Sequence, residues 1–350
     1  MQTGSLNAVA LRKRKWGRLV RRWLTVSALV FAVASVHGQA LVHNALGAPE
    51  PSPPAPSDVR PSSSVFRSGI DVVALNVVVT DPQQKFVNGL TAQDFAVFED
   101  GVAQDVSFFS ATHVPLDLAI LLDTSASMGD KMKSVQEAAI GFASSVRQGD
   151  RVMIVDIKDS TRILQPLTGD VKAATAAIDS TTAKGGTGLY NGLYLTLKEL
   201  ANERRTSTDM RRQAIAVLSD GDDTTSLVSF EDVMDAAKRS GIAIYTITLR
   251  SQWALQQAMQ TGHRYFSQSE YAMKALAVET GGRSFFPMTI SELNGVYGSI
   301  ADELANEYAL GYTPKNVKED GNYRRVMVQV MDHPGARTRT RAGYMASRVQ

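Results

Sequence analysis

The sequence predicts an α/β protein with a doubly wound, mostly parallel sheet and a small sandwich-like unit of flanking β-strands. Between residues 115 and 306, short apolar runs alternate with segments of helical periodicity, which is typical of repeated βα units. Strand-forming residues without helical periodicity lie on either side, at residues 65–112 and 308–346. We expect these two flanks to pack together, because neither has enough strands to cover its own apolar face.

The composition is that of a globular protein and excludes several function classes. The 350 residues are 44% hydrophobic and 21% charged, enough for two modest domains. The absence of cysteine excludes thiolate chemistry and thiolate metal sites. After the first 48 residues, 30 of the 37 Lys and Arg remain against all 35 Asp and Glu, a net charge of −5. This balance offers no electrostatic basis for a nucleic-acid partner.

Residues 1–40 have the pattern of a signal peptide. Seven Lys and Arg between residues 12 and 22 precede an apolar run at residues 23–36, and small residues follow it. The run is shorter than the roughly 20 residues of a membrane-spanning helix, so we expect cleavage; an uncleaved anchor is the alternative, and it would be the only membrane contact. The protein is therefore predicted to be exported, to the periplasm, the cell envelope or the medium.

Residues 41–64 are predicted to be a Pro/Ser-rich linker. Six of the 12 prolines of the chain fall between residues 49 and 61, a composition typical of extended chain without a core. After an export signal such a segment usually serves as a stalk, and the alternative is a ligand for aromatic grooves.

Each further element follows from its local pattern. In the flanks, β-branched and aromatic runs predict strands at residues 72–79, 95–98, 106–109, 308–312, 323–330 and 337–344. Between them, continuous apolar runs predict strands buried on both faces at residues 118–122, 151–157, 215–218, 242–249 and 284–286. Helical periodicity predicts helices at residues 131–146, 171–178, 189–200, 230–239, 271–279 and 290–306.

Oxygen-bearing side chains lie at one edge of the predicted sheet, on three separate loops. They are Asp123, Ser125, Ser127, Thr187 and Asp220. Ligands of an open α/β sheet bind outside the carboxyl ends of its strands, so we expect these side chains to converge there. Oxygen-only ligands suit a hard cation such as Mg²⁺. The sequence therefore predicts a metal site at this edge.

These five positions resemble the metal-ion-dependent adhesion site (MIDAS) of the von Willebrand factor type A (VWA) domain, and they match it without substitution and in chain order. Residues 89–109, 307–312 and 341–344 resemble the flanks of the VWFA-related acidobacterial domain family. The resemblance covers about residues 65–346 and implies a Rossmann-like VWA domain. It also implies an exported adhesion-type protein, in which Mg²⁺, or alternatively Mn²⁺ or Ca²⁺, recruits an Asp or Glu carboxylate of a partner protein.

Several of these residues have simpler interpretations. Asp and Ser are preferred before helices, so Asp123, Ser125 and Ser127 could be helix caps. Asp222 and Asp223 could enlarge the metal site or simply be solvated. The alternating Arg337, Arg339 and Arg341 share one strand face, which could be an anion-binding strip or the solvated face of an edge strand. The five histidines, His37, His43, His113, His263 and His333, show no ligand spacing, and none is predicted to be catalytic.

The function predicted from the sequence is a metal-dependent adhesion or protein-binding module. The alternatives are a metal-assisted hydrolase and a structural envelope scaffold with a vestigial metal site. No general base is evident near the five positions, and Ser125 is not in a Gly-x-Ser-x-Gly elbow, so we predict no enzymatic activity. Residues 251–268 fit no pattern, and their role stays unassigned.

Overall fold

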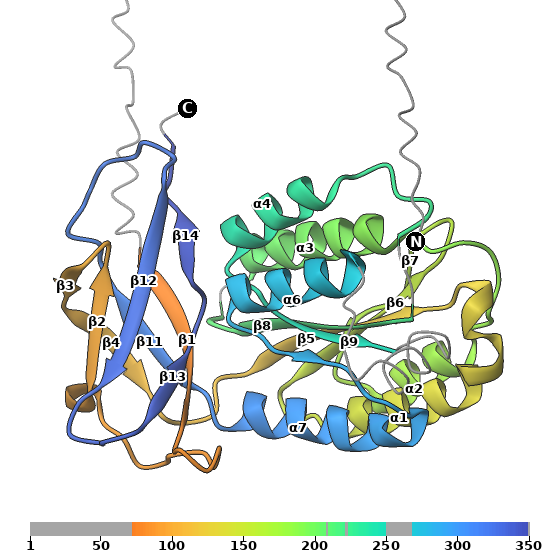
Figure 1. Cartoon of the computed structure of the whole chain (residues 1–350), viewed down its shortest axis with the longest axis horizontal. Helices are drawn as coiled ribbons and strands as arrows, with labels where there is room; N and C mark the ends of the chain where they lie inside the picture. The colour runs from red at the N-terminus through yellow and green to blue at the C-terminus, as the bar shows by residue number, and fades with distance from the viewer. Residues whose placement is uncertain (1–71, 208, 221–222, 250–267, 349–350) are drawn as a thin grey trace, which may run out of the picture. The chain divides into compact units, whose positions relative to one another are not determined.

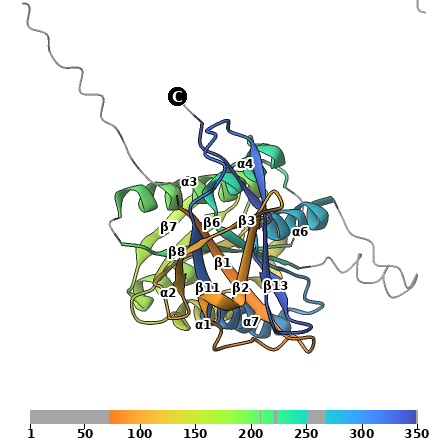
Figure 2. The same ribbon diagram turned by 90° about the vertical axis from the view of Figure 1, so that its left-hand side faces the viewer.

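The computed structural model describes residues 72–207, 209–220, 223–249 and 268–348, all within one compact unit that spans residues 66–350. The predicted signal peptide and linker, residues 65–71 of the predicted N-terminal β unit, and residues 251–267 lie outside the described residues. The described part contains an α/β domain and a β unit of two sheets (Figures 1 and 2). In this part no helix combines the length and the apolar character needed to span a membrane.

The α/β domain is built on a six-stranded sheet of order β10-β9-β8-β5-β6-β7. Its strands are β5 (Leu116–Asp123), β6 (Arg151–Ile157), β7 (Arg162–Thr168), β8 (Arg212–Ser219), β9 (Ala243–Thr248) and β10 (Ser284–Phe285). Neighbours pair in parallel except β6 with β7. The predicted doubly wound, mostly parallel sheet is thus confirmed. From β5 the sheet continues with β6 on one side and β8 on the other, so β5 and β8 flank the point where the strand order reverses.

Helices cover both faces of this sheet (Figure 1). One face carries α1 (Met132–Ser144), α2 (Val171–Asp179) and α7 (Leu293–Ala305), and the other carries α3 (Leu189–Thr206), α4 (Phe230–Ser240) and α6 (Gln268–Thr280). Two short 3₁₀ helices, η2 (Ala126–Lys131) and η3 (Ile290–Glu292), precede α1 and α7. All eight residues of β5 are buried, because helices pack on both sides of the strand. Each large apolar side chain fully buried in this way contributes about 1.5–3 kcal/mol to stability.

The β unit joins strands from both flanks of the α/β domain. Its elements are β1 (Val73–Thr80), η1 (Ala92–Asp94), β2 (Phe95–Glu99), β3 (Val102–Gln104), β4 (Val106–Ser110), β11 (Tyr308–Tyr312), β12 (Tyr323–Val330), β13 (Arg337–Arg339) and β14 (Gly343–Met345). The two sheets have the orders β13-β1-β11-β4 and β14-β12-β2-β3, so each pairs N-terminal with C-terminal strands. Figure 2 looks onto this unit, where β1 and β11 lie side by side. A shared apolar core fills the space between the sheets and confirms the predicted sandwich-like unit.

The strand predictions were wrong in three places. Residues 337–344 are not one strand, because β13 pairs with β1 in one sheet and β14 pairs with β12 in the other. Strand β3 was missed because it has only three residues. Strand β7 was missed as well: it contains Pro166, which argues against a central strand but is tolerated here at the edge of the sheet.

Candidate metal centre

The five predicted ligands lie at the carboxyl ends of β5 and β8 and on the turn before α3. We call this set, Asp123, Ser125, Ser127, Thr187 and Asp220, the cup. Leu122 of β5 pairs with Leu218 of β8, so the two strands end at the same level. The cup therefore lies where the strand order reverses, the usual ligand position of an open α/β sheet.

Asp123 is fully buried at the floor of the cup. One carboxylate oxygen accepts a hydrogen bond from the Ser125 backbone N–H at 2.9 Å, and the other accepts from the Ser219 hydroxyl at 2.6 Å. Burial raises the pKa of Asp123, and the nearby charge of Asp220 adds to this rise. Sequence analysis missed the role of Ser219, although its position directly after a buried run and before Asp220 was a usable signal.

Two hydroxyls connect the floor of the cup to Asp220. The Ser125 and Ser127 hydroxyl oxygens lie 2.9 Å apart, and the Ser127 hydroxyl donates to Asp220 Oδ1 at 2.8 Å. Thr124, between them and Asp123 in the chain, points away and donates to Asp156 on β6. Ser125 is the first cap residue of η2 but makes no capping hydrogen bond with its side chain. The structure therefore does not support a capping role for Ser125.

A lysine that sequence analysis did not single out also contacts the cup. The Lys131 ammonium group, at the end of η2, forms an ion pair with Asp220 Oδ2. The Asp220 side chain is only 4% exposed and that of Lys131 is 29% exposed, so the pair is largely shielded from water. The spacing of Lys131 from the cup in sequence gave no signal, because the contact crosses from one loop to another.

Thr187 reaches the cup on a glycine-rich turn. Backbone bonds hold its segment to the first loop: the Ala126 N–H donates to the Gly185 carbonyl at 2.9 Å, and the Lys184 N–H donates to the Thr124 carbonyl at 2.8 Å. Gly185 adopts a φ of +80°, a conformation that favours glycine. Thr187 itself is buried, and its hydroxyl makes no hydrogen bond to any residue that the structure describes.

The donor set of the cup fits a small hard cation. It offers two carboxylates and three hydroxyls, which is the chemistry that Mg²⁺ takes in proteins together with water. The described residues contain no group of three or more His, Asp or Glu that could hold an ion, so an ion here would depend on the hydroxyls as well. The structure joins Asp123, Ser125, Ser127 and Asp220 by hydrogen bonds and brings Thr187 to them through its loop. Their assignment as metal ligands stays a prediction.

The neighbouring aspartates do not extend the cup in the described part of the chain. Asp223 accepts hydrogen bonds from the Tyr190 N–H at 3.2 Å and from the Ser226 hydroxyl at 2.6 Å. Its carboxylate thus anchors the start of α3 to the loop after β8. Asp222 lies outside the described residues.

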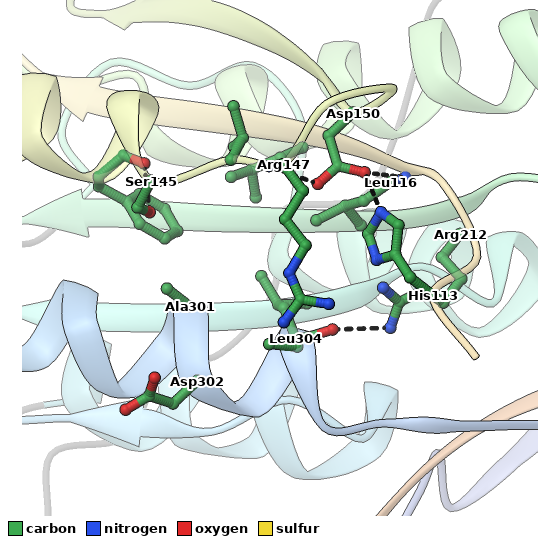
Figure 3. Close-up of a pocket in the computed structure, with 13 residues that line it drawn as sticks. His113, Leu116, Ser145, Arg147, Asp150, Arg212, Ala301, Asp302 and Leu304 are labelled. Carbon is green, nitrogen blue, oxygen red and sulfur yellow. Dashed lines mark hydrogen bonds and ion pairs between the residues drawn. The ribbon is translucent and has the colours of Figure 1, made fainter. Parts of the chain in front are cut away.

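A cavity of about 230 Å³ lies at the opposite, amino end of the strands, between β5, α1 and α7 (Figure 3). There the His113 ring points at Asp150, with Nε2 3.0 Å from the carboxylate. The same carboxylate accepts from the Leu116 N–H at 2.8 Å and from the Arg147 N–H at 3.0 Å. His113 therefore helps to anchor the loop between α1 and β6, at the end of the sheet opposite the cup.

The solvated interpretation of the arginine strand was wrong for Arg339. Strand β13 is indeed at a sheet edge, and Arg337 is exposed there. Arg339 instead forms an ion pair with Glu303 of α7 and donates to the Gly281 carbonyl. The strand face meets the α/β domain and is not fully open to water. Arg341 is also partly buried.

Comparisons with known proteins agree with this architecture. Residues 117–286 match the family model of the von Willebrand factor type A domain. Two curated relatives are uncharacterized protein sll0103 of Synechocystis, 30% identical over 31% of this chain and 26% of its own length, and a UPF0353 protein of Mycobacterium marinum, 25% identical over 55% and 61%. The chain thus spans less than two thirds of either relative.

Two solved structures were also similar. A von Willebrand factor type A protein from Catenulispora acidiphila is 14% identical and covers 73% of this chain and 74% of its own, with a TM-score of 0.45. Proximal thread matrix protein 1 of the mussel byssus, solved with a zinc occupied MIDAS motif, is 17% identical over 58% and 48% of the two chains, with a TM-score of 0.43. From the family match and the sheet order, residues 117–286 of this chain are a von Willebrand factor type A domain.

Proposed function

We propose that this chain is an exported, metal-dependent adhesion module whose cup holds Mg²⁺ and recruits an acidic side chain of a partner protein. Mn²⁺ and Ca²⁺ are the other candidate ions. The observation that carries the proposal is the hydrogen-bonded group of two carboxylates and two hydroxyls at the reversal point of a VWA sheet. Asp123, Ser125, Ser127, Thr187 and Asp220 would hold the ion, and the bound ion would supply a positive charge for a carboxylate to approach.

An acidic protein side chain is the partner group that this chemistry favours. Mg²⁺ prefers oxygen ligands, and a carboxylate is the strongest one that a protein surface offers. Ser127 is exposed, so one side of the cup is open to a partner. The net negative charge of the chain after residue 48 disfavours nucleic acid as a partner.

Binding is favoured over catalysis by the surroundings of the hydroxyls. Ser125 is paired with Ser127, and Ser127 with Asp220, and among the described residues no imidazole forms a hydrogen bond with either hydroxyl. His113 is engaged with Asp150 at the other end of the sheet. A metal-assisted hydrolase and a scaffold with a vestigial site are the alternatives, and the pull-down described below distinguishes the scaffold from the adhesion module.

Thermal unfolding in MgCl₂ and in chelator tests the metal site. Ligand at about a hundred times its dissociation constant adds about 2.7 kcal/mol to stability, so chelator should lower the melting temperature of the wild-type chain. Asp123→Ala should lose this response. Asp235→Ala, which changes an exposed carboxylate on α4, is the matched control and should keep it. An equal response of Asp123→Ala and Asp235→Ala would refute the assignment of Asp123.

Two further experiments test partner and location. The wild-type chain should retain envelope proteins in a pull-down with Mg²⁺ and release them in chelator, whereas Asp123→Ala should retain none. Retention that is the same with and without chelator, and in the wild type and Asp123→Ala, would favour the scaffold alternative.

Fractionation of cells that express the full chain, or a chain lacking residues 1–40, tests export. Equal distribution of the two chains would contradict export.

A further inference from the structure

A cavity of about 600 Å³ lies at the amino ends of β8 and β9, away from the cup. One wall is formed by β1, β4 and β11 and is mostly apolar: Val72, Ala74 and Phe108 line it, together with the polar Asn76 and Ser107. The other wall is formed by the starts of β8 and β9 and by the C-terminal ends of α3 and α4. The volume is in the range of sites that enclose small organic ligands, roughly 300–1,000 Å³.

Arg341 lines this cavity without an acceptor for its guanidinium group. It forms no hydrogen bond or ion pair with any residue of the described part of the chain, and its buried Nε has no partner. Its contact is with the ring of Tyr344, whose centroid lies 5.3 Å from the guanidinium carbon. Unpaired buried charge is costly, so a guanidinium in this position favours an anion beside it.

The other charged residues of the cavity leave its net charge positive. Arg211 is paired with Asp117, and Arg212 with Glu307, so these two cations are already neutralised. The remaining charged lining residues are Arg204, Arg239 and Arg341 against Asp209. Burial lowers the pKa of Arg341 to about 10, and the charge of Arg204 contributes to this shift. The guanidinium groups of Arg341 and Arg204 repel each other, and one anion between them would stabilise both.

A glycine leaves the space that the Arg341 guanidinium group occupies. Gly241, which ends α4 with a φ of +66°, has no side chain, and a Cβ there would lie 2.5 Å from Arg341 Nη1. Arg204 donates to the neighbouring Ser240 carbonyl at 2.7 Å. Both guanidinium groups therefore meet at the end of α4, beside the apolar wall.

We propose that this cavity binds an amphipathic organic anion, with its carboxylate at Arg341 and Arg204 and its apolar body against Val72, Ala74 and Phe108. A guanidinium group offers paired N–H donors that match a carboxylate. The apolar body of such an anion would be buried against the apolar wall, and a fully hydrophilic anion would gain no binding free energy there. The site shares no residue with the cup and does not depend on metal.

Isothermal titration of the chain with decanoate, in chelator, tests this site. Decanol provides the same apolar body without the charge, and acetate provides the charge without the body. We expect one decanoate per chain, with decanol and acetate at least about tenfold weaker, because each lacks one half of the recognition. Failure of decanoate to bind the wild type at millimolar concentration would overturn the proposal. Because chelator is present throughout, the result is independent of the proposed metal site.

Three variants identify the site. Arg341→Met should weaken decanoate at least about tenfold, as expected for a lost charge-assisted hydrogen bond. Arg337→Met, which changes an exposed arginine of the same segment, should bind like the wild type. Ala74→Trp places a bulky ring at an exposed position of the apolar wall and should abolish binding with every arginine intact.

Circular dichroism melts of each variant show which of them are folded. If Arg341→Met does not fold, Ala74→Trp decides the question alone. A folded Ala74→Trp or Arg341→Met chain that binds decanoate as tightly as the wild type would overturn the proposal.

Discussion

Removal of the Lys131 charge should tighten the binding of Mg²⁺ to the cup. In the structure the Lys131 ammonium group forms an ion pair with Asp220 Oδ2, on the carboxylate that the proposed ion would also use. The lysine and the ion would therefore compete for the negative charge of Asp220. Lys131→Met removes this competitor and keeps an unbranched side chain of similar length.

The burial of the Lys131–Asp220 ion pair determines how much free energy its removal should change. Exposed ion pairs are worth about 0–1 kcal/mol, and disruption of a fully buried pair costs about 3–5 kcal/mol. With one partner 29% exposed and the other 4%, the Lys131–Asp220 pair should lie between these limits, at about 1–2 kcal/mol. This corresponds to Mg²⁺ binding that is about 5- to 30-fold tighter in Lys131→Met.

Titration calorimetry with MgCl₂ measures this change, and Lys133→Met is the matched control. Lys133 is exposed and two residues away, so its removal should leave the dissociation constant nearly unchanged. In chelator, Lys131→Met should be less stable than the wild type, because Asp220 then lacks its counter-charge. The reasoning is refuted if Lys131→Met and Lys133→Met bind Mg²⁺ with the same affinity, or if Lys131→Met loses Mg²⁺ binding altogether.

Three further predictions concern the β unit and the pH dependence of the cup. Glu99→Gln should destabilise the chain by up to about 3–5 kcal/mol in urea unfolding, because the buried Arg324 loses its buried carboxylate partner and keeps only the more exposed Asp320, at 3.9 Å; Glu319→Gln, at an exposed site, should not, and equal midpoints would contradict this. A chain that ends at Asn306 lacks β11 and β12, which pair with β1 and β2, so it should aggregate or bind a hydrophobic dye; a soluble chain that melts like the full one would show that the flanks are independent. Burial raises the pKa of Asp123, so its contribution to the stability of the metal-free chain is fully present below the pKa of this carboxyl in the unfolded chain and is lost as pH rises from there through the raised pKa of the folded chain. Because Mg²⁺ needs the ionised carboxylate, the rise in melting temperature on adding MgCl₂ should shrink as pH falls through this pKa, and a rise that does not change with pH would argue against Asp123 as a ligand.

Prediction from the sequence was most successful for structural features that depend on neighbouring residues in the chain. The run at residues 118–122 is continuously apolar because helices cover both faces of β5, and this is visible without knowing which helices they are. The position of the cup followed in the same way, since the carboxyl end of each parallel strand can be read from the chain. Local patterns failed at β3, which is too short to show a period, and at β7, where Pro166 obscures an edge strand.

The sequence by itself determined the α/β class and the five oxygen ligands to be tested, and the pairing of the two β flanks followed only from the shortage of strands in each. Periodicity and residue type are properties of neighbouring positions, so they need no knowledge of distant contacts. Only the tertiary structure decided that Lys131 neutralises Asp220, that Ser219 holds Asp123, and that Arg341 faces a cavity without an acceptor. These features depend on which loops and strands meet in space, and residues far apart in the chain carry no local signal of such a meeting.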